Sequence, residues 1–78
     1  DIRIKVMNNR MLLERDQGDV RRSHIRLYDL RGRKLLHRQW NAATLDVPLP
    51  AKNQIYLLTI EQNGKVIHAE KIEHTTAW

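Results

Sequence analysis

The sequence contains no cysteine and no phenylalanine, and it has only three glycines and two prolines. Without cysteine, neither a disulfide framework nor a thiolate metal site can support the fold, so stability has to come from packing. No apolar run reaches the ~18 residues of a membrane-spanning helix, and no segment resembles a signal peptide. The four aromatics, two Trp and two Tyr, never pair at positions i and i+2, so a base-stacking platform for single-stranded nucleic acid is not expected.

The 78 residues are enough for one domain, covering 1–78. A domain of this size buries only ~60% of the surface of its unfolded chain, which leaves no room for an enclosed active-site cavity. The net charge of +5 suggests an anionic partner such as nucleic acid, lipid head groups or an acidic polysaccharide. Most arginines and lysines alternate with other residues, however, and this favours a solvated basic sheet face. Because the chain starts at Asp1, we expect a processed product or a fragment of a larger protein.

Short alternations of apolar and polar residues, separated by turn residues, run along the whole chain. A period of two is typical of half-buried strands, and no segment has helical periodicity. Asn8-Asn9 and Asn63-Gly64 are expected to form tight hairpin turns, and Pro48, which cannot donate to a ladder, places its strand at an edge or a bulge. The expected strands are 2–6, 10–14, 23–30, 34–40, 44–50, 54–62 and 65–73.

Short strands at this even spacing predict an all-β fold, and we expect a seven-stranded antiparallel β-sandwich. Tyr28 and Tyr56 are expected in the core or at its edge, and Trp40 is placed to cap it. The segment 29–32 is expected to be a turn, in which the Asp29 carboxylate accepts backbone amide hydrogens and Gly32 takes a positive φ. The expected core consists of Ile2, Ile4, Val6, Leu12, Ile25, Leu27, Leu35, Leu45, Val47, Leu49, Tyr56, Leu58, Ile60 and Ile72.

Residues suited to catalysis or metal binding are scattered. Ser23 and His24 are neighbours in one expected strand, so their side chains point to opposite faces and cannot act together. Two histidines from different strands could meet across a sheet and bind zinc with a carboxylate, but structural zinc normally has closely spaced ligand pairs. Surface imidazoles are therefore expected for His24, His37, His68 and His74. We expect a binding module without enzymatic activity, metal or cofactor.

The candidate partner contacts are Arg31, Arg33 and Lys34, which project from the turn, together with Trp78 at the chain end. The basic residues suit an acidic protein surface or anionic lipopolysaccharide, and solubility explains them equally well. Trp78 would either anchor the chain in a partner or lie frayed. Exposed strand edges also offer edge pairing, with a partner or as a homodimer.

From residue 23 onward, the order of elements resembles a known family. The elements are an apolar-x-apolar-Tyr-Asp-Leu-x-Gly-Arg segment at 25–35, an amphipathic strand ending in Leu-Pro at 44–50, Ile-Tyr-Leu-Leu-Thr-Ile at 55–60, Asn-Gly-Lys at 63–65 and Lys-Ile at 71–72. Together they are similar to the C-terminal sorting domain (CTD) family of the type IX secretion system of Bacteroidetes. The residues that match the family motif are Tyr28, Asp29, Leu30, Gly32, Arg33, Ile55, Tyr56, Asn63, Gly64, Lys65 and Lys71.

The resemblance implies an immunoglobulin-like β-sandwich at the C-terminal end of a larger secreted protein. Such a domain is exported through the periplasm to the outer membrane and cell surface. It acts as a folded sorting signal for protein transport, read by protein components of the type IX secretion and attachment machinery. The family usually has Gly before Ile-Tyr, where this chain has Gln54 after Asn53.

The segment after residue 73 also departs from the basic end of ordinary cargo domains. This leaves open a second form, in which a non-cleaved domain of a surface sortase-complex component acts in complex assembly. Two further hypotheses are a nucleic-acid-binding small β-barrel and an immunoglobulin-like spacer without an address function. No nucleic acid is expected as a partner, because the basic residues mostly alternate along strands.

Overall fold

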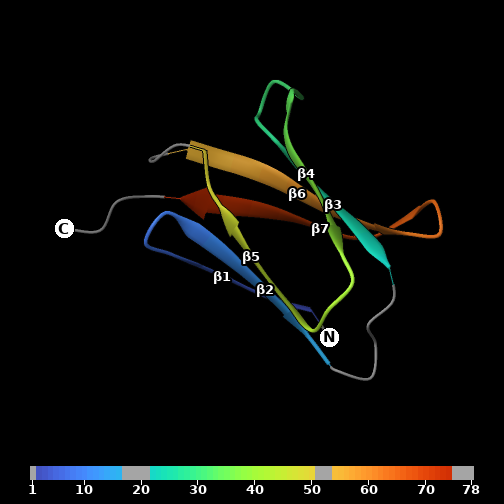
Figure 1. Ribbon diagram of the computed structural model, residues 1–78. Helices are drawn as coiled ribbons and strands as arrows, with labels where there is room; N and C mark the ends of the chain where they lie inside the picture. Colours follow the sequence, from blue (N-terminus) through green and yellow to red (C-terminus); the bar gives the residue numbers. More distant parts are fainter. Residues whose placement is uncertain (1, 17–21, 51–53, 75–78) are drawn as a thin grey trace.

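The computed structural model describes residues 2–16, 22–50 and 54–74, and within these segments it has seven strands and no helix. The strands form two antiparallel sheets, with orders β1-β2-β5 and β4-β3-β6-β7, which Figure 1 shows as two layers. The predicted all-β fold with seven antiparallel strands is therefore confirmed. The strands are β1 (Ile2–Met7), β2 (Arg10–Arg15), β3 (Ser23–Tyr28), β4 (Lys34–Trp40), β5 (Thr44–Pro48), β6 (Gln54–Gln62) and β7 (Lys65–His74).

Most strand ends lie where the sequence predicts them, and the differences have local causes. β3 ends at Tyr28, two residues before its predicted end, because Asp29 already belongs to the turn. β5 ends at Pro48, also two residues early, and it lies at the edge of its sheet as the proline predicts. Three strands, β1, β2 and β7, each continue one residue further, to Met7, Arg15 and His74.

The two tightest hairpins have the turn geometry that their residues predict. Asn8 and Asn9 have φ values of 52° and 63°, and Asn63 and Gly64 have 52° and 77°. Positive φ at both central residues is the signature of a type I′ turn, whose twist matches that of the flanking strands. The β1–β2 turn is also bonded to the residue that follows β5, because Leu49 N donates to Asn9 O at 2.9 Å.

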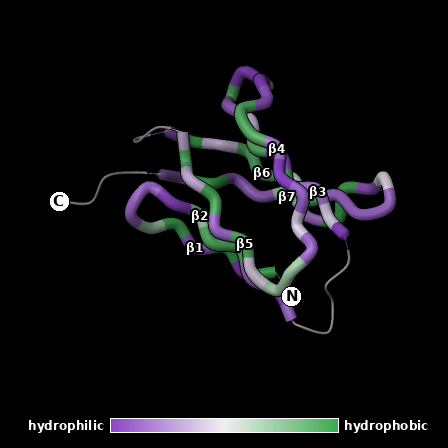
Figure 2. Tube along the Cα trace, in the orientation of Figure 1, coloured by the Kyte–Doolittle hydropathy of each residue, from purple (hydrophilic) through white to green (hydrophobic). Residues whose placement is uncertain are grey.

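The core lies between the two sheets and takes one face from each. It includes eight residues predicted to be buried, whereas Ile2, Ile4, Val6 and Leu45 are half-buried and pack against it. Figure 2 shows hydrophobic segments along strands of both sheets. The buried apolar residues are Met11, Leu13, Ile25, Leu27, Trp40, Val47, Leu49, Tyr56, Leu58, Ile60 and Ile72.

The prediction that Leu12 belongs to the core is wrong, because the register of the first hairpin reverses the face. The two-residue Asn8-Asn9 turn pairs Val6 with Met11. Met11 therefore lies on the inward face with Val6, and Leu13 follows it two residues later. Leu12 points the other way and is only partly buried.

The prediction for Leu35 is also wrong, and a β-bulge explains it. Leu27 pairs with Leu36 while Tyr28 pairs with Lys34, so Leu35 is the extra residue of β4 in this ladder. Leu36 takes the position against the core, and Leu35 is 38% exposed.

A buried arginine joins the two sheets. Arg15, 4% exposed at the end of β2, donates from Nη1 to Ser23 Oγ at 2.8 Å, from Nη2 to Trp40 O at 3.1 Å and from Nε to Ala42 O at 3.1 Å. Its guanidinium carbon lies 4.0 Å from the Trp40 ring centroid, a cation–π contact. Gln62 Nε2 also donates to Ser23 Oγ at 2.9 Å. The inward face of β2 therefore continues from Leu13 into a polar contact with β3 and β4.

Candidate functional site: the β3–β4 turn

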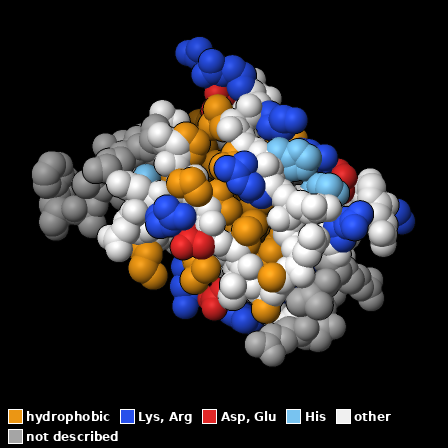
Figure 3. Space-filling view, in the orientation of Figure 1, with side chains coloured by type: hydrophobic (Ala, Val, Ile, Leu, Met, Phe, Trp, Pro, Cys, Tyr) orange, Lys and Arg blue, Asp and Glu red, His pale blue; other side chains and the backbone are white. Residues whose placement is uncertain are grey.

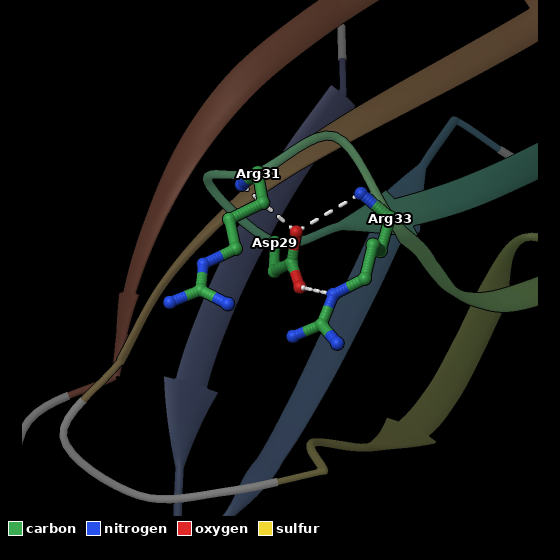
Figure 4. Close-up of polar contacts among 3 residues, drawn as sticks. All are labelled: Asp29, Arg31 and Arg33. Atoms are coloured by element: carbon green, nitrogen blue, oxygen red, sulfur yellow. Dashed lines mark hydrogen bonds and ion pairs between the residues drawn. The ribbon is translucent and has the colours of Figure 1, made fainter.

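Residues 29–33, here called the β3–β4 turn, are organised around one carboxylate (Figure 4). Asp29 Oδ1 accepts hydrogen bonds from Arg31 N and Arg33 N, both at 2.9 Å. Asp29 Oδ2 accepts from Arg33 Nε at 2.7 Å, which is also an ion pair. Backbone bonds from Asp29 N to Arg33 O and from Gly32 N to Asp29 O, both 3.0 Å, close the turn. The predicted role of Asp29 as turn acceptor is confirmed.

Gly32 is required by backbone conformation and not by lack of space. Its φ is +86°, in the region that side chains with a Cβ avoid. A Cβ built on it would meet nothing within 4 Å. Substitution would therefore strain the turn without creating a clash.

The Asp29 carboxylate is held ionised by its donors. The backbone amide of Arg33 is the largest cause that lowers the pKa of Asp29, and the Arg33 side chain and the Arg31 amide act in the same direction. Partial desolvation opposes them. The Asp29 side chain is 13% exposed, whereas that of Arg33 is 70% exposed, so the acid lies under its partner and the cation faces solvent.

The turn borders an open depression of about 480 Å³ that also takes residues from the start of β6. It brings together the β3–β4 turn and Gln54-Ile55, which are far apart in the sequence. Leu30 is 72% exposed on this turn. Figure 3 shows Lys and Arg side chains gathered at the end of the molecule where Figure 1 places this turn. The lining residues are Asp29, Leu30, Arg31, Arg33, Gln54 and Ile55.

The remaining motif residues do not join this depression. Tyr56 is fully buried and Tyr28 is half-buried, as predicted for core or core-edge positions. Asn63, Gly64 and Lys65 lie at the opposite end of β6 from Gln54. Lys71 forms an ion pair with Glu73 at 3.4 Å on β7. Trp78, and the corner at Asn53, lie outside the described residues.

The structure places Ser23 and His24 on opposite faces, as expected. Ser23 is fully buried and accepts hydrogen bonds from Arg15 and Gln62. His24 faces outward, where its Nδ1 lies 3.1 Å from Nε2 of His37 across the β3–β4 ladder. Two histidines from different strands thus meet, which the sequence leaves open as an alternative to separate surface imidazoles. In the described part of the chain, no group of three His, Asp or Glu residues is placed to hold a metal ion.

The surroundings of His37 disfavour its protonation. Partial desolvation of the ring is the largest cause that lowers the pKa of His37, followed by the charges of Arg26, His24 and Lys34. Glu61, which pairs with Arg26 at 3.1 Å, acts in the opposite direction. The pair of rings thus lies in a predominantly cationic patch.

His74 contradicts the expectation that all four histidines are surface imidazoles. It is only 5% exposed, and its Nε2 donates to Asn9 Oδ1 at 2.9 Å. Nothing local in the sequence marks this contact, because it depends on how the end of β7 meets the β1–β2 turn. Gln54 in the depression and the burial of Arg15 also become visible only in three dimensions.

Comparison of the chain with protein-family models, with curated proteins and with solved structures gives no match. Among the described residues, no helix is long and apolar enough to cross a membrane. The features of the chain that bear on its function are therefore the geometry of the β3–β4 turn and the sequence resemblance.

Proposed function

We propose that the chain is a type IX C-terminal sorting domain with an immunoglobulin-like sandwich fold. In this proposal the folded domain is the signal that the outer-membrane export and attachment machinery reads. The observation that carries the proposal is the depression at the β3–β4 turn. Two segments that are far apart in the sequence meet there, and Leu30, Arg31 and Arg33 are exposed to solvent at its border.

The turn has the physical properties of a preformed recognition surface. The bonds from Arg31, Arg33 and the backbone to Asp29 fix its shape before any partner arrives, which lowers the entropy that binding costs. The fixed turn displays exposed Leu30 and cationic Arg31 side by side. A partner with an apolar contact flanked by acidic groups fits this combination, and anionic lipopolysaccharide fits its charge.

The test is export of a reporter. Residues 1–78 are fused to the C-terminus of a periplasmically targeted reporter in a cell with a working type IX system and in a matched strain without the translocon. We expect the reporter at the cell surface in the first strain and in the periplasm in the second. A reporter that stays in the periplasm of both strains would refute the cargo function.

A charge reversal tests whether the export machinery recognises the turn itself or only the overall positive charge of the domain. Arg31→Glu is expected to lower the surface fraction of the reporter several-fold, because it inverts the charge beside Leu30. Arg3→Glu makes the same change at an exposed position of β1, outside the motif, and is expected to leave export unchanged. Equal effects of the two variants would show that the turn is not the part that is read.

The same resemblance extends to PorZ, a sortase-complex component that retains such a domain. For this form, deletion of the domain from its parent protein would abolish complex assembly at the surface. Tight, steeply salt-dependent binding to oligonucleotides would instead favour the nucleic-acid-binding barrel and count against both forms.

A further inference from the structure

The two sheets have four edge strands, β1 and β5 in one and β4 and β7 in the other. An edge strand presents backbone N–H and C=O groups that no neighbouring strand of its own sheet uses. β5 contains Pro48, which has no N–H to donate. β1 and β7 approach each other at a few positions, but no ladder joins them in the described residues, so both edges remain open. β4 is distinguished from these two edges by its charge.

β4 is uncovered over most of its length. Only Leu36 and Trp40 of its residues are buried or half-buried, and the others are exposed. Exposure therefore extends to both faces of the strand. β4 is the edge strand of its sheet, and Figure 1 shows it leading from the β3–β4 turn. A strand added alongside β4 would continue the four-stranded sheet.

The charge of β4 indicates the kind of strand that it would accept. β4 contains Lys34, His37 and Arg38 and no acidic residue. Within the described ranges, neither Lys34 nor Arg38 has a carboxylate within 4.0 Å. The other open edges differ, because Lys5 of β1 pairs with Glu14 at 3.6 Å and Lys71 of β7 pairs with Glu73 at 3.4 Å.

The positions of these cations cover both faces. Lys34 lies opposite Tyr28 and Arg38 lies opposite Ile25, and those two residues of β3 point to opposite sides of the sheet. An incoming strand would thus meet a cation on either face. A second copy of β4 would bring the same positive charges together, which disfavours pairing of the domain with itself at this edge.

We propose that the β4 edge binds an acidic, extended segment of a partner protein by strand addition. Backbone hydrogen bonds to β4 supply the attachment, and carboxylates of the segment contact Lys34 and Arg38. The cationic side chains that protect this edge from self-association select the partner at the same time. This binding mode does not depend on the export function proposed above.

The probe is a capped, fluorescent peptide of about eight residues, the length of an ordinary strand, made of glutamate, valine and threonine. Its binding to the 1–78 domain is measured by fluorescence anisotropy. We expect the double variant Lys34→Glu, Arg38→Glu to weaken binding about tenfold, because two favourable ion pairs become repulsive. The matched variant Lys65→Glu, Lys71→Glu on β7 is expected to change affinity less than about twofold. Far-UV circular dichroism and urea midpoints verify that both variants are folded.

Two further measurements distinguish strand addition from simple charge attraction. Peptide binding is expected to slow hydrogen exchange of β4 amides, and N-methylation of alternate peptide residues, which removes backbone donors, is expected to abolish binding. Equal binding of the methylated peptide, equal loss in the β7 variant, or no binding at all would overturn the proposal. A dimer of the free domain with protected β4 amides would overturn it as well, because a second copy would then be the occupant.

Discussion

Replacement of Arg15 by alanine should be among the most damaging single changes in this domain. The guanidinium donates three hydrogen bonds, to Ser23 Oγ, Trp40 O and Ala42 O, and lies against the Trp40 ring. Alanine removes all three donated bonds, although Ser23 Oγ keeps the bond from Gln62 Nε2. Each buried acceptor that loses its donor lowers the free energy of unfolding by about 1–3 kcal/mol. The variant no longer has to remove a guanidinium from water on folding, and this offsets part of the loss.

The net loss in the free energy of unfolding for Arg15→Ala is therefore expected to be about 2–4 kcal/mol. A domain of 78 residues has a total stability of about 4–12 kcal/mol at 0.05–0.15 kcal/mol per residue. The variant would thus lose a large fraction of its stability. The assay is urea unfolding followed by far-UV circular dichroism, analysed by linear extrapolation with the slope compared between variants.

Arg10→Ala is the matched control, because Arg10 has the same chemistry at the other end of β2. Its Nε pairs with Asp46 Oδ1 at 2.8 Å, but the two side chains are 51% and 57% exposed. An exposed pair of this kind contributes less than about 1 kcal/mol. If Arg15→Ala lost no more stability than Arg10→Ala, water would replace the guanidinium without cost, and the role assigned to Arg15 would be refuted.

In urea unfolding, Leu13→Ala is expected to cost about 2–5 kcal/mol and Leu12→Ala less than about 1 kcal/mol, because only Leu13 lies in the core. The reverse order would contradict the register of β2. Gly64→Ala is expected to cost about 1 kcal/mol in the same assay, because its φ of +77° strains any residue with a Cβ, and an unchanged urea midpoint would argue against the type I′ turn. The pKa of His37 is lower in the folded state than in the unfolded chain. As the pH falls below about 6.5, the unfolded chain therefore binds the proton first. The free energy of unfolding should decrease over this pH range, down to the lowered pKa of the folded state. His37→Gln should flatten this part of the curve of urea midpoint against pH, and an identical curve for the variant would mean that His37 is not responsible.

The features that the sequence predicts well are those that depend on neighbouring residues. The Asn63-Gly64 turn and the acceptor role of Asp29 follow from local conformational preferences and short-range hydrogen bonds. Leu35 is misplaced because an alternating pattern cannot reveal a bulge, which is a property of two paired strands. The burial of Arg15 depends on residues of three other segments and has no local signal.

The candidate site likewise has a part that neighbouring residues predict and a part that depends on residues far away in the sequence. The motif from Tyr28 to Arg33 predicts the turn, but not the depression that it forms with Gln54 and Ile55 of β6. The pairing of His24 with His37 depends on the same β3–β4 register that includes the bulge. Function assigned from the motif alone would therefore miss the surface that a partner would meet.

The bond between His74 and Asn9 joins residues 65 positions apart, and β7 also supplies Ile72 to the core. A ribosome adding about 5–20 residues per second needs roughly 3–13 s to make the chain between them. During that interval β6 lacks its β7 neighbour and the β1–β2 turn lacks its His74 contact. The seven-stranded fold therefore cannot be completed before β7 has left the ribosome.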